Sequence, residues 1–316
     1  MAASKPLISL IVPAYNEALN IEWFYKALQN SVKSLGNYKF EYIFIDDGSK
    51  DETLTILQKL TASDTAVRYI GFSRNFGKEA ATSAGIQAAR GDAVIIMDAD
   101  GQHPPSLIKS FLEDWEKGNE VVIGMRAANT KEGAIKRYGS KIFYKLLAFF
   151  VGEDAQAGAT DFRLLDRKVI NEFLKLTERN RMTRSLIDWI GFKRSYISFV
   201  APARHQGEAS YNYSKLLKLA LHGFVSQTTK PLQFAGILGF FVTTVSLLAT
   251  AFVLVENYIL GDPINLDITG TAMLALFLSF LVGLVLICQW LLALYIESIH
   301  TETQNRPLYI ISKKSE

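Results

Sequence analysis

From its start to about residue 125, the chain alternates between short apolar runs rich in β-branched residues and longer stretches with helical periodicity. The pattern predicts strands at 7–12, 41–45, 67–72, 93–97 and 121–124. Helices are expected between them, at about 18–35, 49–60, 77–89 and 106–117. Strands that alternate with helices at this spacing form a parallel, doubly wound α/β sheet. Ser49 and Glu52 have the spacing of a capping box at the start of the second helix.

Polar residues and glycines follow four of these strands directly, in the segments 13–17, 46–49, 73–78 and 98–102. The carboxyl ends of parallel strands lie at the same edge of a sheet, where open α/β folds bind their ligands. We therefore expect these loops to meet in a nucleotide site. The first strand is not followed by Gly-x-Gly-x-x-Gly, and the chain contains no Gly-Lys-Ser/Thr, which disfavours dinucleotide-binding and P-loop proteins.

The last of these loops has the features of a divalent cation site. Asp98 and Asp100 come directly after the apolar run 93–97, and a glycine and two prolines follow them closely. Carboxylate oxygens on a short loop suit Mg²⁺ or Mn²⁺, which usually bind together with substrate phosphates. The alternative is a solvated turn, since surface loops commonly carry carboxylates.

The apolar pattern changes in the last third of the chain, where two long segments contain no charged residue. They are 231–255 and 268–296. Each is long enough for a helix that crosses the hydrocarbon core of a bilayer, which needs about 20 residues. The alternative is a pair of buried helices in a soluble core. Uncharged runs of this length are rare in soluble helices, so we expect two membrane spans.

The charges beside the two segments predict their orientation. The connecting loop 256–267 has three acidic residues and no Lys or Arg, whereas basic residues precede the first segment and follow the second. The positive-inside rule therefore places a domain formed by 1–210 and a tail formed by 297–316 in the cytosol. Basic and aromatic residues interleave in 136–151 and 211–230, which suggests amphipathic helices at the membrane surface. For 136–151, a helix that faces the protein core is the alternative.

Composition adds a few limits to this picture. The net charge of the 316 residues is only +3, which gives no sign of nucleic-acid binding. Cys288 is the only cysteine, so no internal disulfide can form. Met1–Lys5 leads directly into the first expected strand, and we therefore expect no cleavable signal peptide.

The loops together resemble those of family-two inverting glycosyltransferases of the GT-A fold. The resemblance is closer to the polyprenyl-phosphate glycosyltransferases, and within them to the bacterial undecaprenyl-phosphate glucosyltransferase branch. The matching segments cover nearly the whole chain and are 11–17, 46–51, 73–79, 98–105, 160–164, 204–208 and 306–309. The resemblance implies a GT-A type, mostly parallel sheet followed by interfacial helices and two transmembrane helices. It also suggests a homotetramer in the cell membrane.

The implied reaction is transfer of a sugar, with inversion, from a UDP-sugar to undecaprenyl phosphate, in the presence of Mg²⁺ or Mn²⁺. Glucose is the expected sugar, and UDP-GlcNAc or GDP-mannose are alternative donors. A processive polysaccharide synthase is disfavoured because the chain lacks Gln-x-x-Arg-Trp and additional spans. A non-catalytic membrane scaffold that binds nucleotide sugars is a further alternative, which the presence of Asp98, Asp100 and Asp161 disfavours.

The resemblance also assigns roles to individual residues. Asp98 and Asp100 would hold the metal, with Gln102 as a third ligand through its carbonyl oxygen. Asp161 and Arg204 would act beside Asp100 in catalysis, Asp161 as a base or as an orienting group and Arg204 on a phosphate. The remaining donor-site residues would contact the nucleotide sugar: Pro13, Tyr15, Glu17, Asp46, Asp47, Arg74 and Lys78.

Each assignment has a purely structural alternative. Asp47 could cap the next helix, Arg74 and Lys78 could form surface ion pairs, and Asp161 could pair with Arg163. His103 is expected to be an exposed residue of a turn. The chain also departs from the family pattern at Gly101, where Leu is usual, and at Ala209-Ser210, where Ser/Thr-Lys is usual. We expect Gly101 to loosen the metal loop, and the second departure removes a cation that could meet a phosphate.

Overall fold

The computed structural model of the chain describes residues 5–127, 158–179, 181–202, 248, 255 and 270–315. The chain divides into two compact units. The described residues up to 202, together with those from 305 onward, belong to the first unit, and the rest belong to the second. We describe each unit by itself.

The first unit contains an eight-stranded sheet in the order β7-β5-β6-β4-β1-β2-β3-β8. The strands are β1 (Leu7–Ala14), β2 (Lys39–Asp46), β3 (Val67–Phe72), β4 (Ala93–Ile96), β5 (Val121–Arg126), β6 (Ala159–Asp166), β7 (Arg194–Phe199) and β8 (Ile311–Lys314). Strands β4, β1, β2 and β3 are parallel neighbours, which confirms the predicted doubly wound arrangement. Strand β6 runs antiparallel between β4 and β5, and the sequence pattern does not predict it.

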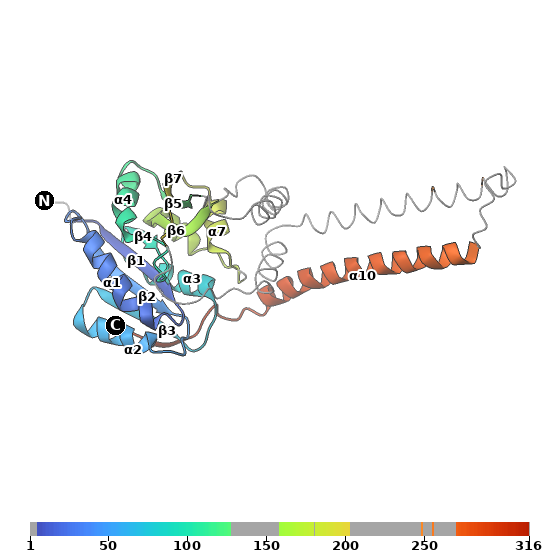
Figure 1. Ribbon diagram of the computed structural model, residues 1–316, viewed down its shortest axis with the longest axis horizontal. Coiled ribbons are helices and arrows are strands. Elements are labelled where there is room, and N and C mark those ends of the chain that lie inside the picture. Colours follow the sequence, from blue (N-terminus) through green and yellow to red (C-terminus); the bar gives the residue numbers. More distant parts are fainter. Residues whose placement is uncertain are drawn as a thin grey trace. The chain divides into compact units, whose positions relative to one another are not determined.

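Helices cover both faces of this sheet (Figure 1). They are α1 (Ala18–Val32), α2 (Thr53–Ser63), α3 (Lys78–Ala88), α4 (Ile108–Glu116) after the short 3₁₀ turn η1 (Pro105–Leu107), α6 (Arg167–Phe173) and α7 (Thr183–Ile190). Side chains of β1 alternate between the two faces: Leu10 and Val12 pack with α1, α2 and α4, while Ile11 packs with α3, α6 and α7. This two-residue period produces two separate cores, and it explains why these strands read as continuous apolar runs.

The last strand of the sheet comes from the end of the chain. Strand β8 pairs antiparallel with β3, with Lys313 opposite Gly71. Just before it, the ring of Tyr309 stacks on Phe72 with centroids 4.8 Å apart, and its hydroxyl donates to Gln87 Oε1 at 2.6 Å. The pattern does not predict this strand, because four residues of mixed polarity give no period of their own.

The described part of the second unit is mainly the 34-residue helix α10 (Gly270–Thr303). This helix includes residues 270–296 of the second predicted span. Among the described residues, no helix combines the length and the apolar character needed to cross a membrane. The two spans therefore stay predictions, and the expected segments 136–151 and 211–230 lie outside the described residues, as does most of 231–267.

The predicted capping box at the start of α2 is wrong. Helix α2 begins at Thr53, whose backbone N–H donates to Asp51 Oδ1 at 3.0 Å, and the N-cap Glu52 makes no side-chain cap. Ser49 Oγ instead accepts from the backbone N–H of Asn16 at 2.9 Å. Asn16 Oδ1 in turn accepts from the backbone N–H of Lys50 at 2.8 Å. Asp51 thus bonds the start of the helix locally, and Ser49 takes part in a contact between two loops instead.

Gly48 is the position at which the loop after β2 passes the loop after β3. Its φ of +67° lies in the left-handed region, and an added Cβ would lie 2.2 Å from the backbone carbonyl carbon of Arg74. The backbones at Gly48 and Arg74 cannot move apart easily, because both loops are hydrogen-bonded to neighbouring elements. Glycine is therefore required here both for its conformation and for close approach.

We predict that Gly48→Ala lowers the thermal unfolding midpoint far more than Gly118→Ala does. Gly118 also has a positive φ, of +84°, but an added Cβ would have nothing within 4 Å in the described part of the chain. Gly118→Ala is therefore a control that measures the cost of the left-handed backbone conformation alone. That cost is about 1–2 kcal/mol, and the clash at Gly48 should add about 1–3 kcal/mol or more. Thermal unfolding of the two variants and the wild type measures the difference. Equal destabilisation would show that the two loops separate freely.

Candidate functional site

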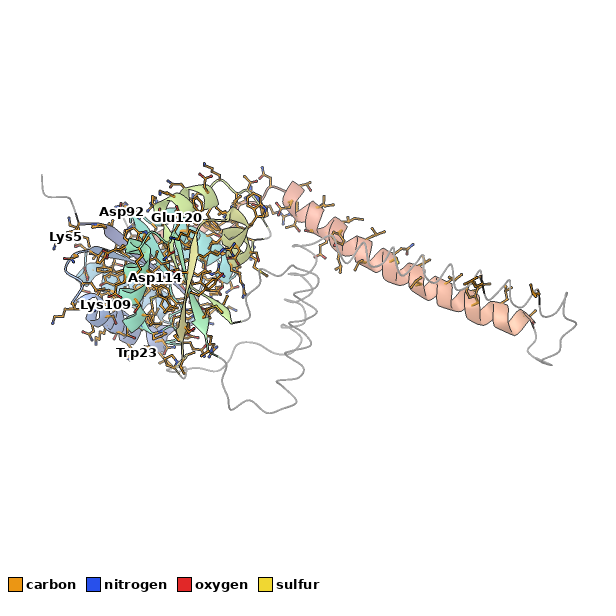
Figure 2. All side chains as sticks on the ribbon, turned by 90° about the horizontal axis from the view of Figure 1, so that it is seen from above. Lys5, Trp23, Asp92, Lys109, Asp114 and Glu120 are labelled. Carbon is orange, nitrogen blue, oxygen red and sulfur yellow. The ribbon has the colours of Figure 1, made fainter. Side chains whose placement is uncertain are left out.

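One ammonium group joins two of the carboxylates that the sequence singled out. Lys78 is the first residue of α3, Asp98 follows β4, and Asp161 lies on β6. Lys78 Nζ lies 2.7 Å from Asp98 Oδ1 and 2.9 Å from Asp161 Oδ2. The cluster therefore lies at the carboxyl end of β4, the edge at which the sequence placed the nucleotide site. Asp92 and Glu120 precede β4 and β5 and lie at the other edge, where Figure 2 labels them.

The charges of this cluster keep Asp161 ionised. Burial raises the pKa of Asp161, but the charges of Lys78 and Arg184 and a hydrogen bond from Lys78 outweigh it and hold that pKa at about 2. Burial lowers the pKa of Lys78, and the two carboxylates more than compensate, so its pKa is raised above the ordinary value. Lys78 is therefore a permanent cation at neutral pH.

The structural alternative for Asp161, an ion pair with Arg163, is wrong. The Arg163 side chain is 2% exposed, and its Nη1 lies 3.1 Å from Asp188 Oδ1. Burial lowers the pKa of Arg163 despite the attraction of Asp188. Asp161 is instead paired with Lys78 and, at 3.9 Å from Oδ1 to Nε, with Arg184. A carboxylate held by two cations from other elements is a feature that spacing along the chain does not reveal.

The sequence pattern assigned no role to two further residues of this region, Glu79 and Arg184. Glu79 Oε2 accepts from both the backbone N–H of Thr183 at 2.8 Å and its hydroxyl at 2.5 Å. These bonds tie the start of α7 to the start of α3. They place Arg184, the second residue of α7, beside Asp161. For Arg184, the only signal in the sequence was a basic residue near other arginines, and this does not distinguish a site residue from a solvated one.

The loop after Asp98 is a compact turn. Asp100 Oδ1 accepts from the backbone N–H of Gln102 at 3.0 Å. Gly101, which departs from the family pattern, has a φ of +80°, a conformation that favours glycine over Leu. At this position glycine therefore relieves backbone strain in the turn.

The prediction that His103 is exposed is wrong. His103 is 6% exposed and stacks on Phe162 with ring centroids 5.1 Å apart. Its Nδ1 accepts from the backbone N–H of Asp98 at 3.0 Å, and burial lowers its pKa, which keeps the imidazole neutral. The ring thus fixes the backbone that carries the Asp98 carboxylate, because Phe162 is itself part of the core.

The residues present fit a divalent ion that is shared with a ligand. Among the described residues, no group of three or more His, Cys, Asp or Glu side chains is arranged to hold a metal. Asp98 and Asp100 supply two hard carboxylates, and the Lys78 ammonium now lies against one of them. Mg²⁺ typically takes one or two carboxylates and completes its shell with phosphates and water. The donor set suits that kind of site, with Gln102 as the predicted third ligand.

The loops assigned to the base and ribose are brought together at the same edge. Asp47 accepts from the backbone N–H groups of Phe76 at 2.7 Å and of Gly77 at 2.9 Å, directly before α3. Its carboxylate thus fixes the turn that precedes α3, and helix α3 itself has no side-chain cap among the described residues. Asp46 is 1% exposed and accepts from the backbone N–H of Ser49 at 3.1 Å. Burial raises the pKa of both carboxyl groups, with hydrogen bonds acting in the opposite direction.

The other predicted donor-site residues surround this pair. Pro13 is buried beside Ala14 at the end of β1, Tyr15 is 39% exposed, and Glu17 Oε2 accepts from Asn20 Nδ2 at 2.5 Å. The Arg74 guanidinium lies 4.0 Å from the centre of the Phe76 ring and is exposed. Arg204 lies outside the described residues. The structure thus places the predicted residues that it describes along one sheet edge, and their roles stay predictions.

Comparison with known proteins adds a family to this geometry. Residues 9–174 match the family described as Glycosyl transferase family 2. The chain is 37% identical over 306 residues to the SfII prophage-derived bactoprenol glucosyl transferase of Shigella flexneri, with 97% of each chain covered. It is 36% identical over 305 residues to the glycosyltransferase YkcC of Bacillus subtilis, with 96% of this chain and 93% of the relative covered.

Solved structures are similar in a more distant way, and one of them serves as an example. Glucosyl-3-phosphoglycerate synthase from Mycobacterium tuberculosis, in complex with Mn²⁺, UDP-glucose and phosphoglyceric acid, has a TM-score of 0.43 and 19% identity. The match covers 68% of this chain and 76% of that chain. A likeness this distant does not bear on activity.

We predict that Asp161→Asn lowers the thermal unfolding midpoint by an amount that is constant between pH 5 and pH 8. The pKa of Asp161 in the folded protein, about 2, is below its ordinary value of 3.8. The ion pairs of Asp161 therefore stabilise the fold fully at pH values above 3.8, and this stabilisation is lost as the pH falls through the folded-state pKa. The gap between wild type and variant should therefore narrow only below about pH 4.

Glu113→Gln is the matched control for this experiment. It removes one negative charge from α4, at a side chain that is 56% exposed. Its unfolding midpoint should differ little from that of the wild type at any pH in the range. A gap for Asp161→Asn that changes between pH 5 and pH 8 would mean that Asp161 titrates near neutrality, against the ion pairs described above.

Proposed function

The chain belongs to glycosyl transferase family 2, and from this membership we propose that it transfers a sugar from a nucleotide sugar to a polyprenyl phosphate. It is a transferase, and its full-length similarity to a bactoprenol glucosyl transferase supports glucose as the sugar and undecaprenyl phosphate as the acceptor. UDP-glucose is the donor that this assignment implies. UDP-GlcNAc and GDP-mannose are the alternative donors.

The observation that carries the proposal is the Lys78 bridge between Asp98 and Asp161. It places a carboxylate of the expected metal–diphosphate loop and a second carboxylate within reach of one ammonium nitrogen. Sugar transfer needs the leaving diphosphate and the acceptor on opposite sides of one carbon atom, a few ångströms apart. Two anionic groups held at this separation, at the ligand-binding edge of the sheet, suit such a reaction.

The acceptor's own chemistry reduces what the protein must supply. A phosphate monoester has a second pKa of about 6, so it is largely dianionic at neutral pH and can attack without a general base. Asp161, with a pKa of about 2, is a very weak base. We therefore assign Asp161 an orienting role toward the sugar or the acceptor. Of the two alternatives that the sequence left open, this is the one that its ion pairs favour.

The barrier then depends on the negative charge of the departing diphosphate. Asp98 and Asp100 would hold Mg²⁺ or Mn²⁺, which acts as a Lewis acid on such oxygens when bound. Lys78 would add a fixed positive charge in the same place. Arg74 is exposed beside the loop that carries Lys78, where it can meet phosphate oxygens, and Arg204 is assigned the same kind of contact. Asp46, Asp47 and Glu17 remain the residues proposed to surround the base and ribose.

The acceptor is a lipid, so we propose that the enzyme works at the cell membrane. The uncharged segments 231–255 and 268–296 would span the bilayer, and the sheet domain would lie in the cytosol, where nucleotide sugars are available. A homotetramer is proposed from the family resemblance alone.

The proposed reaction predicts label transfer from UDP-[¹⁴C]glucose to the lipid phase when the full chain is incubated with undecaprenyl phosphate and Mg²⁺ or Mn²⁺. Chelation of the metal should abolish transfer, and either ion should restore it. Asp100→Asn should reduce the rate by about a hundredfold or more, the loss typical of removing a group that acts on transition-state charge. Glu113→Gln, on the exposed face of α4, should leave the rate unchanged.

A panel of labelled donors completes the test. UDP-GlcNAc, UDP-galactose and GDP-mannose should be transferred more slowly than UDP-glucose. Preference for another donor would correct the sugar and leave the reaction class in place. If no donor labels the lipid, the proposed function is wrong and the non-catalytic alternative gains support.

A further inference from the structure

Four charged side chains form an alternating row at the candidate site. The order is Asp98, Lys78, Asp161, Arg184, with successive separations of 2.7 Å, 2.9 Å and 3.9 Å between charged atoms. Lys78 contacts Oδ2 of Asp161, and Arg184 faces its Oδ1. The two cations are therefore on different oxygens of the same carboxylate, and Arg184 is the end of the row that is remote from the metal loop.

Arg184 is held in place by its backbone, and its side chain is available to a ligand. Thr183 is bonded to Glu79, Ile187 is 2% exposed in the core, and the backbone carbonyl of Arg184 accepts from Arg163 at 3.3 Å. The Arg184 side chain is 44% exposed. Within the described part of the chain, its guanidinium has only the long contact with Asp161 and donates no hydrogen bond.

The neighbouring cations are already engaged. Lys78 lies between two carboxylates, and Arg163 is buried against Asp188. Lys78, Asp161 and Arg163 line one depression together with Arg184, Thr82 and Thr183. Among the described residues of this depression, Arg184 is thus the cation with donors to offer an incoming anion. A guanidinium is well suited to a phosphate, because it can donate two parallel hydrogen bonds to two of its oxygens.

We propose that Arg184 binds the phosphate of the acceptor lipid, an inference that rests on the proposed function. Inversion requires the nucleophile to approach the anomeric carbon from the side opposite the leaving diphosphate. If the diphosphate lies at Asp98, the acceptor phosphate belongs at the far end of the row, where Arg184 lies. Arg184 also offsets the repulsion between that phosphate and the Asp161 carboxylate. The row thus separates a donor end from an acceptor end.

The test compares Arg184→Gln and Arg184→Lys with the wild type in the full chain. Arg184→Gln should raise the KM for undecaprenyl phosphate by about tenfold or more, the effect of losing a charge-assisted hydrogen bond. The KM for UDP-glucose should stay within about twofold, since donor contacts lie at the other end of the row. Arg184→Lys should recover part of the loss, because it keeps the charge without the two-pronged geometry.

Lys109→Gln is the matched control. It removes one positive charge at a side chain that is 67% exposed on α4 (Figure 2), and it should change neither KM. The unfolding midpoints of all variants show whether the fold is intact. The unchanged KM for UDP-glucose in Arg184→Gln gives a second check, because a distorted site would weaken donor binding too.

Three outcomes decide the proposal. A rise in the KM for UDP-glucose with an unchanged acceptor KM would move Arg184 to the donor side and overturn it. Equal rises in both constants would also overturn it, since they indicate a structural role. If the wild type transfers no sugar, the proposed function fails separately. Titration calorimetry with a short-chain polyprenyl phosphate and with inorganic phosphate then tests Arg184 directly, and equal binding by wild type and Arg184→Gln would reject the site.

Discussion

The arrangement of the site depends on the ammonium of Lys78 between the carboxylates of Asp98 and Asp161. Two carboxylates that contact the same ammonium nitrogen repel each other, and the cation between them offsets that repulsion. With Lys78 in place, Asp161 stays charged and the separation of the two carboxylates is set. The contact joins the start of α3, the end of β4 and the antiparallel strand β6. A shift of any of these three elements would separate the charged groups of the site.

The fold holds Lys78 in position from several sides. Asp47 bonds the backbone of Phe76 and Gly77 and thereby fixes the start of α3. Phe76 packs edge-on against Phe72, which in turn stacks on Tyr309 just before the C-terminal strand β8. The last residues of the chain therefore support the loop that delivers Lys78. On the other side, His103 fixes the backbone of Asp98 through its imidazole.

These contacts change the chemical interpretation of Asp161. The family resemblance left Asp161 as a general base or an orienting group, yet a carboxylate held at a pKa of about 2 keeps its negative charge and accepts protons poorly. A lipid phosphate needs no such base, because it is already ionised. Binding and orientation of two anionic substrates are then the main tasks, and an alternating row of charges is a simple way to keep them apart.

Local periodicity was enough to predict the first five strands and the four helices between them, because period and apolar content are properties of neighbouring residues. It also placed Asp46, Asp47, Asp98 and Asp100 at one sheet edge, since parallel topology brings strand ends together. Their partners were a different matter. Lys78 and Asp161 are 83 positions apart in the sequence. Arg163 forms its ion pair with Asp188 and not with Asp161, although Asp161 is nearer in the sequence. Packing in the tertiary structure decided which side chains meet, the burial of His103, and the pairing of residues 311–314 with the sheet. The sequence could not predict these contacts, because they leave no periodic signal in the chain.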